Sequence, residues 1–233
     1  MGLIDPHELQ SQRPTPIQVA RSYLSPVVLE HRASSHNPHL LVRLVRGRLR
    51  LDAAHVNYSH GELHEVMDAA FREIHIRGRG VERALLLGLG AGSAVELLRK
   101  RDAPNAHITA IEIDPVVVEL ALRWFPACLD EDVRIACADA AEFVARTEEC
   151  FDLIVVDLFI DEEVPARCET AEFLADCASR LAPGGLLMFN RLADAVHRQG
   201  PTMRFERVFL ETLAGGSVVP ALGNRILVYE KPL

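Results

Sequence analysis

The hydrophobic pattern between residues 83 and 190 repeats one kind of unit. Apolar runs at 84–87, 108–113, 133–138, 153–156 and 186–190 alternate with segments whose apolar residues recur at helical spacing. Runs with so few polar positions indicate strands that are buried on both faces, as in a parallel sheet covered by helices. Two last runs, 217–220 and 224–230, can pair as an antiparallel hairpin at the sheet edge. The pattern predicts an α/β fold with a doubly wound, seven-stranded, mostly parallel, Rossmann-like sheet.

The first 58 residues follow a different pattern. Residues 1 to about 25 are rich in Pro, Gln and Ser, which predicts a loosely held arm. Residues 27–33, 39–45 and 48–54 have the character of β-strands, and Arg46-Gly47 predicts a tight turn between the last two. We therefore expect two parts: an arm with a small β-hairpin region at 1–58, and the Rossmann-like domain at 59–233.

Several short signals place the helices. Ser59 and Glu62 have the S-x-x-E form of a capping box, which predicts a helix start. Asp114-Pro115 predicts an N-cap followed by a proline in the first helical position. Pro183-Gly184-Gly185 predicts a turn before the fifth strand, and a last helix is expected near 205–213. The apolar face of the helix after Ser59 is expected to consist of Leu63, Val66, Met67, Ala70, Phe71 and Ile74.

A glycine turn follows the first of the buried strands. Gly88, Gly90 and Gly92 stand at every second position, and Glu112 lies about 20 residues further on, near the end of the next strand. Glycines let a ligand approach the backbone closely, and an acid in this register can accept both hydroxyls of a ribose. Because Ser93 replaces the third glycine of G-x-G-x-x-G, the pattern favours a nucleoside over a dinucleotide. The alternative is a tight strand-to-helix turn that binds no ligand.

Acidic residues recur where the predicted strands end. Glu112, Asp139, Asp157 and Asp161 follow strands whose carboxyl ends open on one side of the sheet. We expect Glu112 to bind the ribose, Asp139 to accept from an adenine amino group, and Asp157 to lie where the substrate reacts. Any one of these acids could be only an N-cap or a solvated side chain, but successive strand-end positions favour a shared site.

Composition limits the alternatives. The chain has 233 residues, of which 25 are Lys or Arg and 33 are Asp or Glu, and this balance argues against nucleic acid despite the arginines at 43, 46, 48 and 50. No apolar stretch approaches the ~20 residues of a membrane span. Five scattered cysteines without a C-x-x-C pair predict reduced thiols and a cytoplasmic location. His60 and His64 stand four apart, but no third ligand is evident, so no metal is expected.

The order of the motifs resembles a known family. A β-hairpin, SHGELHEVMDAA, GLGAGS, IEID, ADAAEF, VVDLF and LAPGG follow one another as in the spermidine synthase-like branch of the class I S-adenosylmethionine-dependent methyltransferase superfamily. The resemblance covers roughly residues 51–191. It implies cofactor binding by Gly88, Gly90, Gly92, Glu112, Asp139 and Ala140, catalysis by Asp157, and substrate contacts from His64, Glu65 and Asp161. It also implies a homodimer.

Three departures from the family pattern bear on the reaction. Leu63 replaces a tyrosine on the substrate side, Ala91 replaces the Asp of the glycine turn, and the second Asp after strand four is absent or displaced to Asp161. In that family the Asp of the turn holds the amine of decarboxylated S-adenosylmethionine and repels a carboxylate. Ala91 would therefore admit ordinary S-adenosylmethionine.

These departures rank three hypotheses. The first is a methyltransferase that acts on a small-molecule acceptor, with S-adenosylmethionine as cofactor and Asp157 orienting or deprotonating the acceptor. The second is an aminopropyltransferase of polyamine biosynthesis that uses decarboxylated S-adenosylmethionine. The third is a non-catalytic nucleoside-binding protein.

Overall fold

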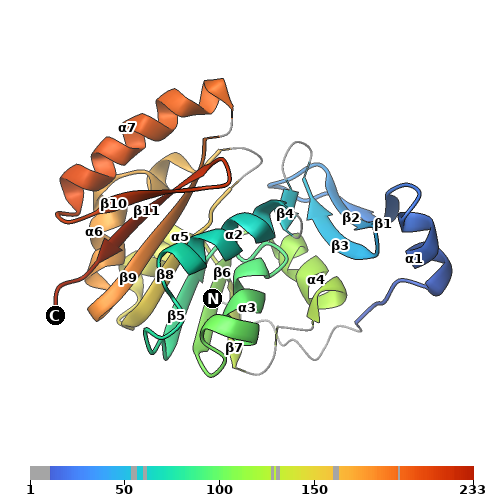
Figure 1. Cartoon of the computed structure of the whole chain (residues 1–233), viewed down its shortest axis with the longest axis horizontal. Coiled ribbons are helices and arrows are strands. Elements are labelled where there is room, and N and C mark those ends of the chain that lie inside the picture. The colour runs from blue at the N-terminus through green and yellow to red at the C-terminus, as the bar shows by residue number, and fades with distance from the viewer. Residues whose placement is uncertain are drawn as a thin grey trace.

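The computed structural model describes residues 11–53, 57–59, 62–126, 129, 132–159, 163–193 and 195–233, which form two sheets (Figure 1). The larger sheet has the strand order β10-β11-β9-β8-β5-β6-β7. Five of its strands are parallel, β11 runs antiparallel to β9, and β10 pairs with β11 as a hairpin. Its strands are β5 (Arg83–Leu87), β6 (His107–Glu112), β7 (Val133–Cys137), β8 (Phe151–Val156), β9 (Leu181–Leu192), β10 (Ser217–Ala221) and β11 (Asn224–Glu230). The predicted fold is confirmed.

Helices cover both faces of this sheet. Side chains of β5 alternate between two cores: Leu86 belongs to one and Leu87 to the other, which explains why this strand is apolar throughout. The first core packs against α2 (Glu62–Glu73), α3 (Ser93–Leu97) with its π-helical extension Leu98–Asp102, and α4 (Pro115–Trp124). The second core packs against α5 (Ala140–Arg146), α6 (Ala171–Ser179) and α7 (Val196–Thr212). Among the described residues, no helix combines the length and apolar character needed to cross a membrane.

The N-terminal part is a second, antiparallel sheet with a helix. Its strands, in the order β1-β2-β3-β4, are β1 (Val27–Arg32), β2 (Leu40–Val45), β3 (Arg48–Asp52) and β4 (Asn57–Ser59). The predicted turn is confirmed, since Arg46 and Gly47 have φ of 49° and 75°. The prediction of a loose arm is wrong for α1 (Pro16–Ser22): Thr15 and Gln18 form a capping box, and a proline at the first helical position costs no hydrogen bond.

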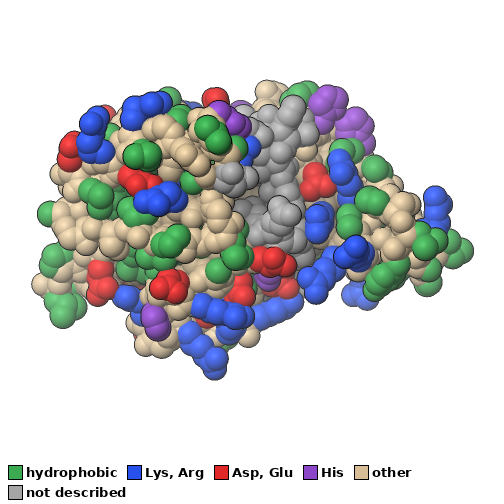
Figure 2. All heavy atoms as spheres, turned by 45° about the horizontal axis from the view of Figure 1, so that its top comes forward, with side chains coloured by type: hydrophobic (Ala, Val, Ile, Leu, Met, Phe, Trp, Pro, Cys, Tyr) green, Lys and Arg blue, Asp and Glu red, His purple; other side chains and the backbone are tan. Residues whose placement is uncertain are grey.

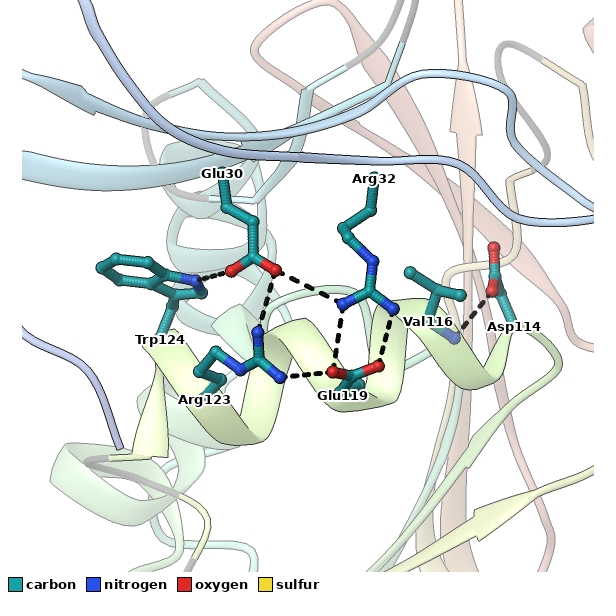
Figure 3. Close-up of polar contacts among 7 residues, drawn as sticks. All are labelled: Glu30, Arg32, Asp114, Val116, Glu119, Arg123 and Trp124. Atoms are coloured by element: carbon teal, nitrogen blue, oxygen red, sulfur yellow. Dashed lines mark hydrogen bonds and ion pairs between the residues drawn. The ribbon is translucent and has the colours of Figure 1, made fainter. Parts of the chain in front are cut away.

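The smaller sheet is anchored on α4 (Figure 3). Glu30 of β1 accepts hydrogen bonds from the Trp124 indole at 2.6 Å and from Arg123 at 2.9 Å. Arg32 donates two parallel bonds of 3.0 Å to Glu119, and these bonds lower the pKa of Glu119. An apolar cluster lies beside this network and joins side chains of β2, β3 and α4. The position of the small sheet is therefore set by the helix that directly follows Glu112.

Two element boundaries differ from the predictions. The helix α7 (Val196–Thr212) begins well before Phe205 and contains Pro201, which lies in its second turn. The strand β9 begins at Leu181, so the Pro-Gly-Gly segment is a bulge within the strand, with Gly184 at φ 75°. The helix after Ser59 is confirmed as α2, although Ser59 itself ends β4 and residues 60 and 61 lie outside the described residues.

Charges of both signs are mixed on the face of the molecule drawn in Figure 2, where Lys and Arg side chains lie among Asp and Glu. Within the small sheet, Arg43 pairs with Asp52 at 3.3 Å. The arginines that stood out in the sequence are therefore partly balanced by acids of the same sheet.

Candidate active site

The glycine turn shows why glycine is required after β5. Gly88 has φ of 98°, and a Cβ placed on it would come within 2.2 Å of the Asp157 carbonyl oxygen. The turn therefore lets the ends of β5 and β8 approach closely, independently of any ligand. Gly90 and Gly92 also have positive φ, 53° and 83°, and Gly92 directly precedes α3.

Glu112 lies behind the glycine turn and holds its shape. Only 8% of its surface is exposed, and one carboxylate oxygen accepts from the backbone N–H groups of Leu89 (3.2 Å) and Gly90 (3.3 Å). The other oxygen accepts from the N–H of Asp114 at 3.1 Å. Burial raises the pKa of Glu112. Three of roughly four acceptor positions are thus used by the backbone, which leaves one for a ribose hydroxyl.

Asp157 is partly buried directly after β8, and Glu112 ends β6, so the two acids lie at the carboxyl ends of the strands on either side of β5. Burial, with a smaller contribution from the Glu112 charge, raises its pKa to about 6, while a hydrogen bond from Asn190 opposes the shift. The Asn190 amide donates to Asp157 Oδ1 at 2.8 Å. The structure therefore brings together Asp157 and Glu112, the residues for which the sequence predicted catalytic and ribose-binding roles.

Asp139 has two polar partners, one in its own helix and one in a distant segment of the chain. It caps α5 by accepting from the N–H of Glu142 at 3.0 Å, and its other oxygen pairs with Arg167. Ala140 is the first residue of α5 and is buried. A role for Asp139 and Ala140 in binding adenine remains a prediction, because the N-cap and the ion pair alone explain an acid at this position.

The residues predicted on the substrate side are only partly described. His64 and Glu65 lie in the first turn of α2, where His64 is partly buried and Glu65 exposed. Asp161 lies outside the described residues, as does the side chain of Leu63. Among the described residues, no group of three or more His, Cys, Asp and Glu side chains is arranged for a metal ion.

Ala91 of the glycine turn faces the small N-terminal sheet. Its side chain is 2% exposed and belongs to the apolar cluster between β2, β3 and α4. An Asp here would place a carboxylate among apolar side chains. Packing explains why an apolar residue suits this position, so the missing charge alone does not decide between the two donors.

The sequence did not point to three polar residues near the site: Asn190, Asn224 and Arg167. The Asn224 amide donates to Asn190 Oδ1 at 2.8 Å, which extends the contact of Asp157 into the edge hairpin. The only signal for Asn190 was an amide at the end of the apolar run LLMFN. Nothing in the sequence singled out Asn224 or Arg167, because their contacts join distant segments.

Comparisons with known proteins agree with this architecture. A family model described as "Spermine/spermidine synthase domain" matches residues 73–216. The polyamine aminopropyltransferase of Vibrio vulnificus is 29% identical over 150 residues, which cover 63% of this chain and 50% of that protein. The eEF1A lysine and N-terminal methyltransferase of Danio rerio is 30% identical over 137 residues, 54% of this chain and 20% of that protein. The chain thus spans half or less of these relatives.

A solved structure shows the same fold over most of the chain. Spermidine synthase from Thermotoga maritima superposes with a TM-score of 0.70 at 18% identity, covering 88% of this chain and 72% of that one. The match of the family model includes the glycine turn, Glu112, Asp139 and Asp157. The chain belongs to the spermine/spermidine synthase domain family.

Proposed function

We propose that this chain transfers a carbon group from an adenosyl-sulfonium donor to an amine. The observation that carries the proposal is Asp157, a partly buried carboxylate at the carboxyl end of β8, which accepts a hydrogen bond from Asn190 at 2.8 Å and whose pKa is raised to about 6. When an amine attacks the carbon next to the sulfonium, the C–S bond breaks, its electrons remain on sulfur, and the new ammonium must lose a proton. A carboxylate with a pKa nearer to 7 is a better acceptor for that proton than an ordinary Asp.

The comparisons support an amine acceptor. The relative from Vibrio vulnificus is named for aminopropyl transfer to polyamines, and the relative from Danio rerio for methylation of lysine and of a protein N-terminus. The two groups transferred differ, but the nucleophile is a nitrogen in both. The donor would lie over the glycine turn, with its ribose at the remaining acceptor position of Glu112.

The relatives reverse the order in which the sequence ranks the two reactions. The family model and the polyamine aminopropyltransferases favour aminopropyl transfer from decarboxylated S-adenosylmethionine, which becomes the first candidate. Methyl transfer from S-adenosylmethionine is the second candidate. It is favoured by Leu63 and Ala91, which stand where the family pattern has groups for the acceptor and the donor amine.

The products distinguish the two reactions. The protein would be incubated with each donor and a set of diamines, polyamines and lysine peptides, and the nucleoside product identified by mass spectrometry. Aminopropyl transfer leaves methylthioadenosine, whereas methyl transfer leaves S-adenosylhomocysteine. We expect methylthioadenosine, formed with the wild type and much more slowly with Asp157→Asn. S-adenosylhomocysteine alone would establish the second candidate, and donor binding without either product would favour a non-catalytic nucleoside-binding protein.

A further inference from the structure

We infer that Asn190 and Asn224 are positioning residues, through which the edge hairpin β10–β11 orients the carboxylate of Asp157. This inference rests on the proposed role of Asp157 in proton transfer. It adds two asparagines to a site that the sequence predicted from acids at strand ends. It also makes the C-terminal hairpin a part of that site.

The contacts form one continuous path across neighbouring strands. Asn224, the first residue of β11, is 5% exposed and donates to Asn190 Oδ1 at 2.8 Å. Asn190 of β9 is fully buried and donates to Asp157 Oδ1 at 2.8 Å. Most buried side-chain amides have hydrogen-bond partners, and here the Asn224 amide donates to Asn190 and the Asn190 amide donates to Asp157.

The Asp157 carboxylate determines how the side-chain amide of Asn190 is oriented. If the Asn190 amide were rotated by half a turn, its oxygen would face a carboxylate oxygen of Asp157, and its NH₂ would face the NH₂ of Asn224. Both contacts would be repulsive, so the observed orientation is the one in which Asn190 presents an N–H to Asp157. Asn224 secures that orientation because its own N–H occupies the Asn190 oxygen.

Two consequences for Asp157 follow from this geometry. A hydrogen bond to the charged form lowers the pKa of the carboxyl and opposes both burial and Glu112, the charged group whose field reaches it. The bond also uses one of the two acceptor positions of Oδ1. Within the described part of the chain, no donor is hydrogen-bonded to Oδ2, so we expect Oδ2 to be the oxygen that receives a proton from the acceptor.

The test compares Asn190→Leu and Asn224→Leu in the full-length chain. Asp157 would be titrated by carbon-13 NMR of its carboxyl group without substrate, and assigned by loss of the signal in Asp157→Asn. We expect its pKa to rise by about one unit or more in Asn190→Leu, because a hydrogen bond to a charge is lost. A smaller rise is expected in Asn224→Leu. The acid limb of the pH profile of kcat/KM should move in the same direction.

Thr202→Val is the matched control. Thr202 is fully buried and donates to the Leu192 carbonyl at 2.8 Å, near the end of the same strand but without contact to Asp157. It should leave the Asp157 titration unchanged. An unchanged titration in Asn224→Leu, or an equal shift in Thr202→Val, would overturn the inference. Because the titration needs no substrate, a shift in a protein without transfer activity would refute the proposed function and leave the positioning of Asp157 supported.

Discussion

Replacing Asp157 by Asn should remove most of the transfer activity, and it should make the stability of the fold less dependent on pH. The Asn side chain is nearly the same shape as Asp and can still accept the hydrogen bond from Asn190 through its oxygen. It removes the ionisable group from a site where burial and Glu112 disfavour a negative charge. The variant should therefore lose the part of the pH dependence of folding that comes from Asp157, together with most of the transfer activity.

The magnitude follows from the pKa of Asp157 in the folded chain, about 6, against an ordinary value of 3.8. Because the folded pKa is raised, protonation of Asp157 stabilises the fold. That contribution is fully present below pH 3.8 and is lost as the pH rises through 6. By linkage, the wild type should lose about 1.4 kcal/mol of unfolding free energy from this group between pH 5 and pH 8. Since Asp157 is only partly buried, solvent screening makes this figure an upper estimate.

Urea unfolding of both proteins at pH 5 and pH 8 measures the effect. The wild type should lose more stability than Asp157→Asn between the two pH values, by up to about 1.4 kcal/mol. Asp152→Asn, at the opposite end of β8, controls for loss of a carboxylate away from the site. Turnover of Asp157→Asn should fall by about 100-fold or more, as expected for loss of a general base. Equal losses of stability in wild type and variant would refute the reasoning about the buried charge.

Other predictions test the turn, the donor site and the assembly. Gly88→Ala should destabilise the fold by about 2 kcal/mol more than Gly78→Ala in urea unfolding. Both glycines have φ above 90°, but of the two only Gly88 would bring an added Cβ against a backbone oxygen. Equal effects would contradict the close approach of the two strand ends. Glu112→Gln should weaken donor binding at least tenfold in calorimetry, because an amide has a single acceptor oxygen for the backbone and the ribose; unchanged affinity would place the donor elsewhere. We also expect a homodimer by light scattering at micromolar concentration, and a monomer mass would count against it.

Uninterrupted apolar runs, separated by segments with helical spacing, were sufficient to predict the main sheet. Residues 84–87 are apolar because they contact cores on both faces of the sheet, so burial is visible in the sequence as an uninterrupted run. Asp114-Pro115 begins α4 as expected, since capping depends on neighbouring residues only. The position of Glu112 relative to the glycine turn was also predictable, because the strand, the turn, the helix and the next strand follow one another in the chain.

The tertiary structure alone determined how the polar groups of the site are paired. Asp157, Asn190 and Asn224 are separated by 33 and 34 residues and meet because β8, β9 and β11 are neighbours in the sheet. The pKa of Asp157 depends on burial, which the identity of the residue does not reveal. Ala91 could be interpreted as a missing charge from the sequence, whereas the structure places its side chain in an apolar cluster formed by the small sheet and α4. Such contacts depend on strand order and on the docking of distant segments, which local sequence patterns do not encode.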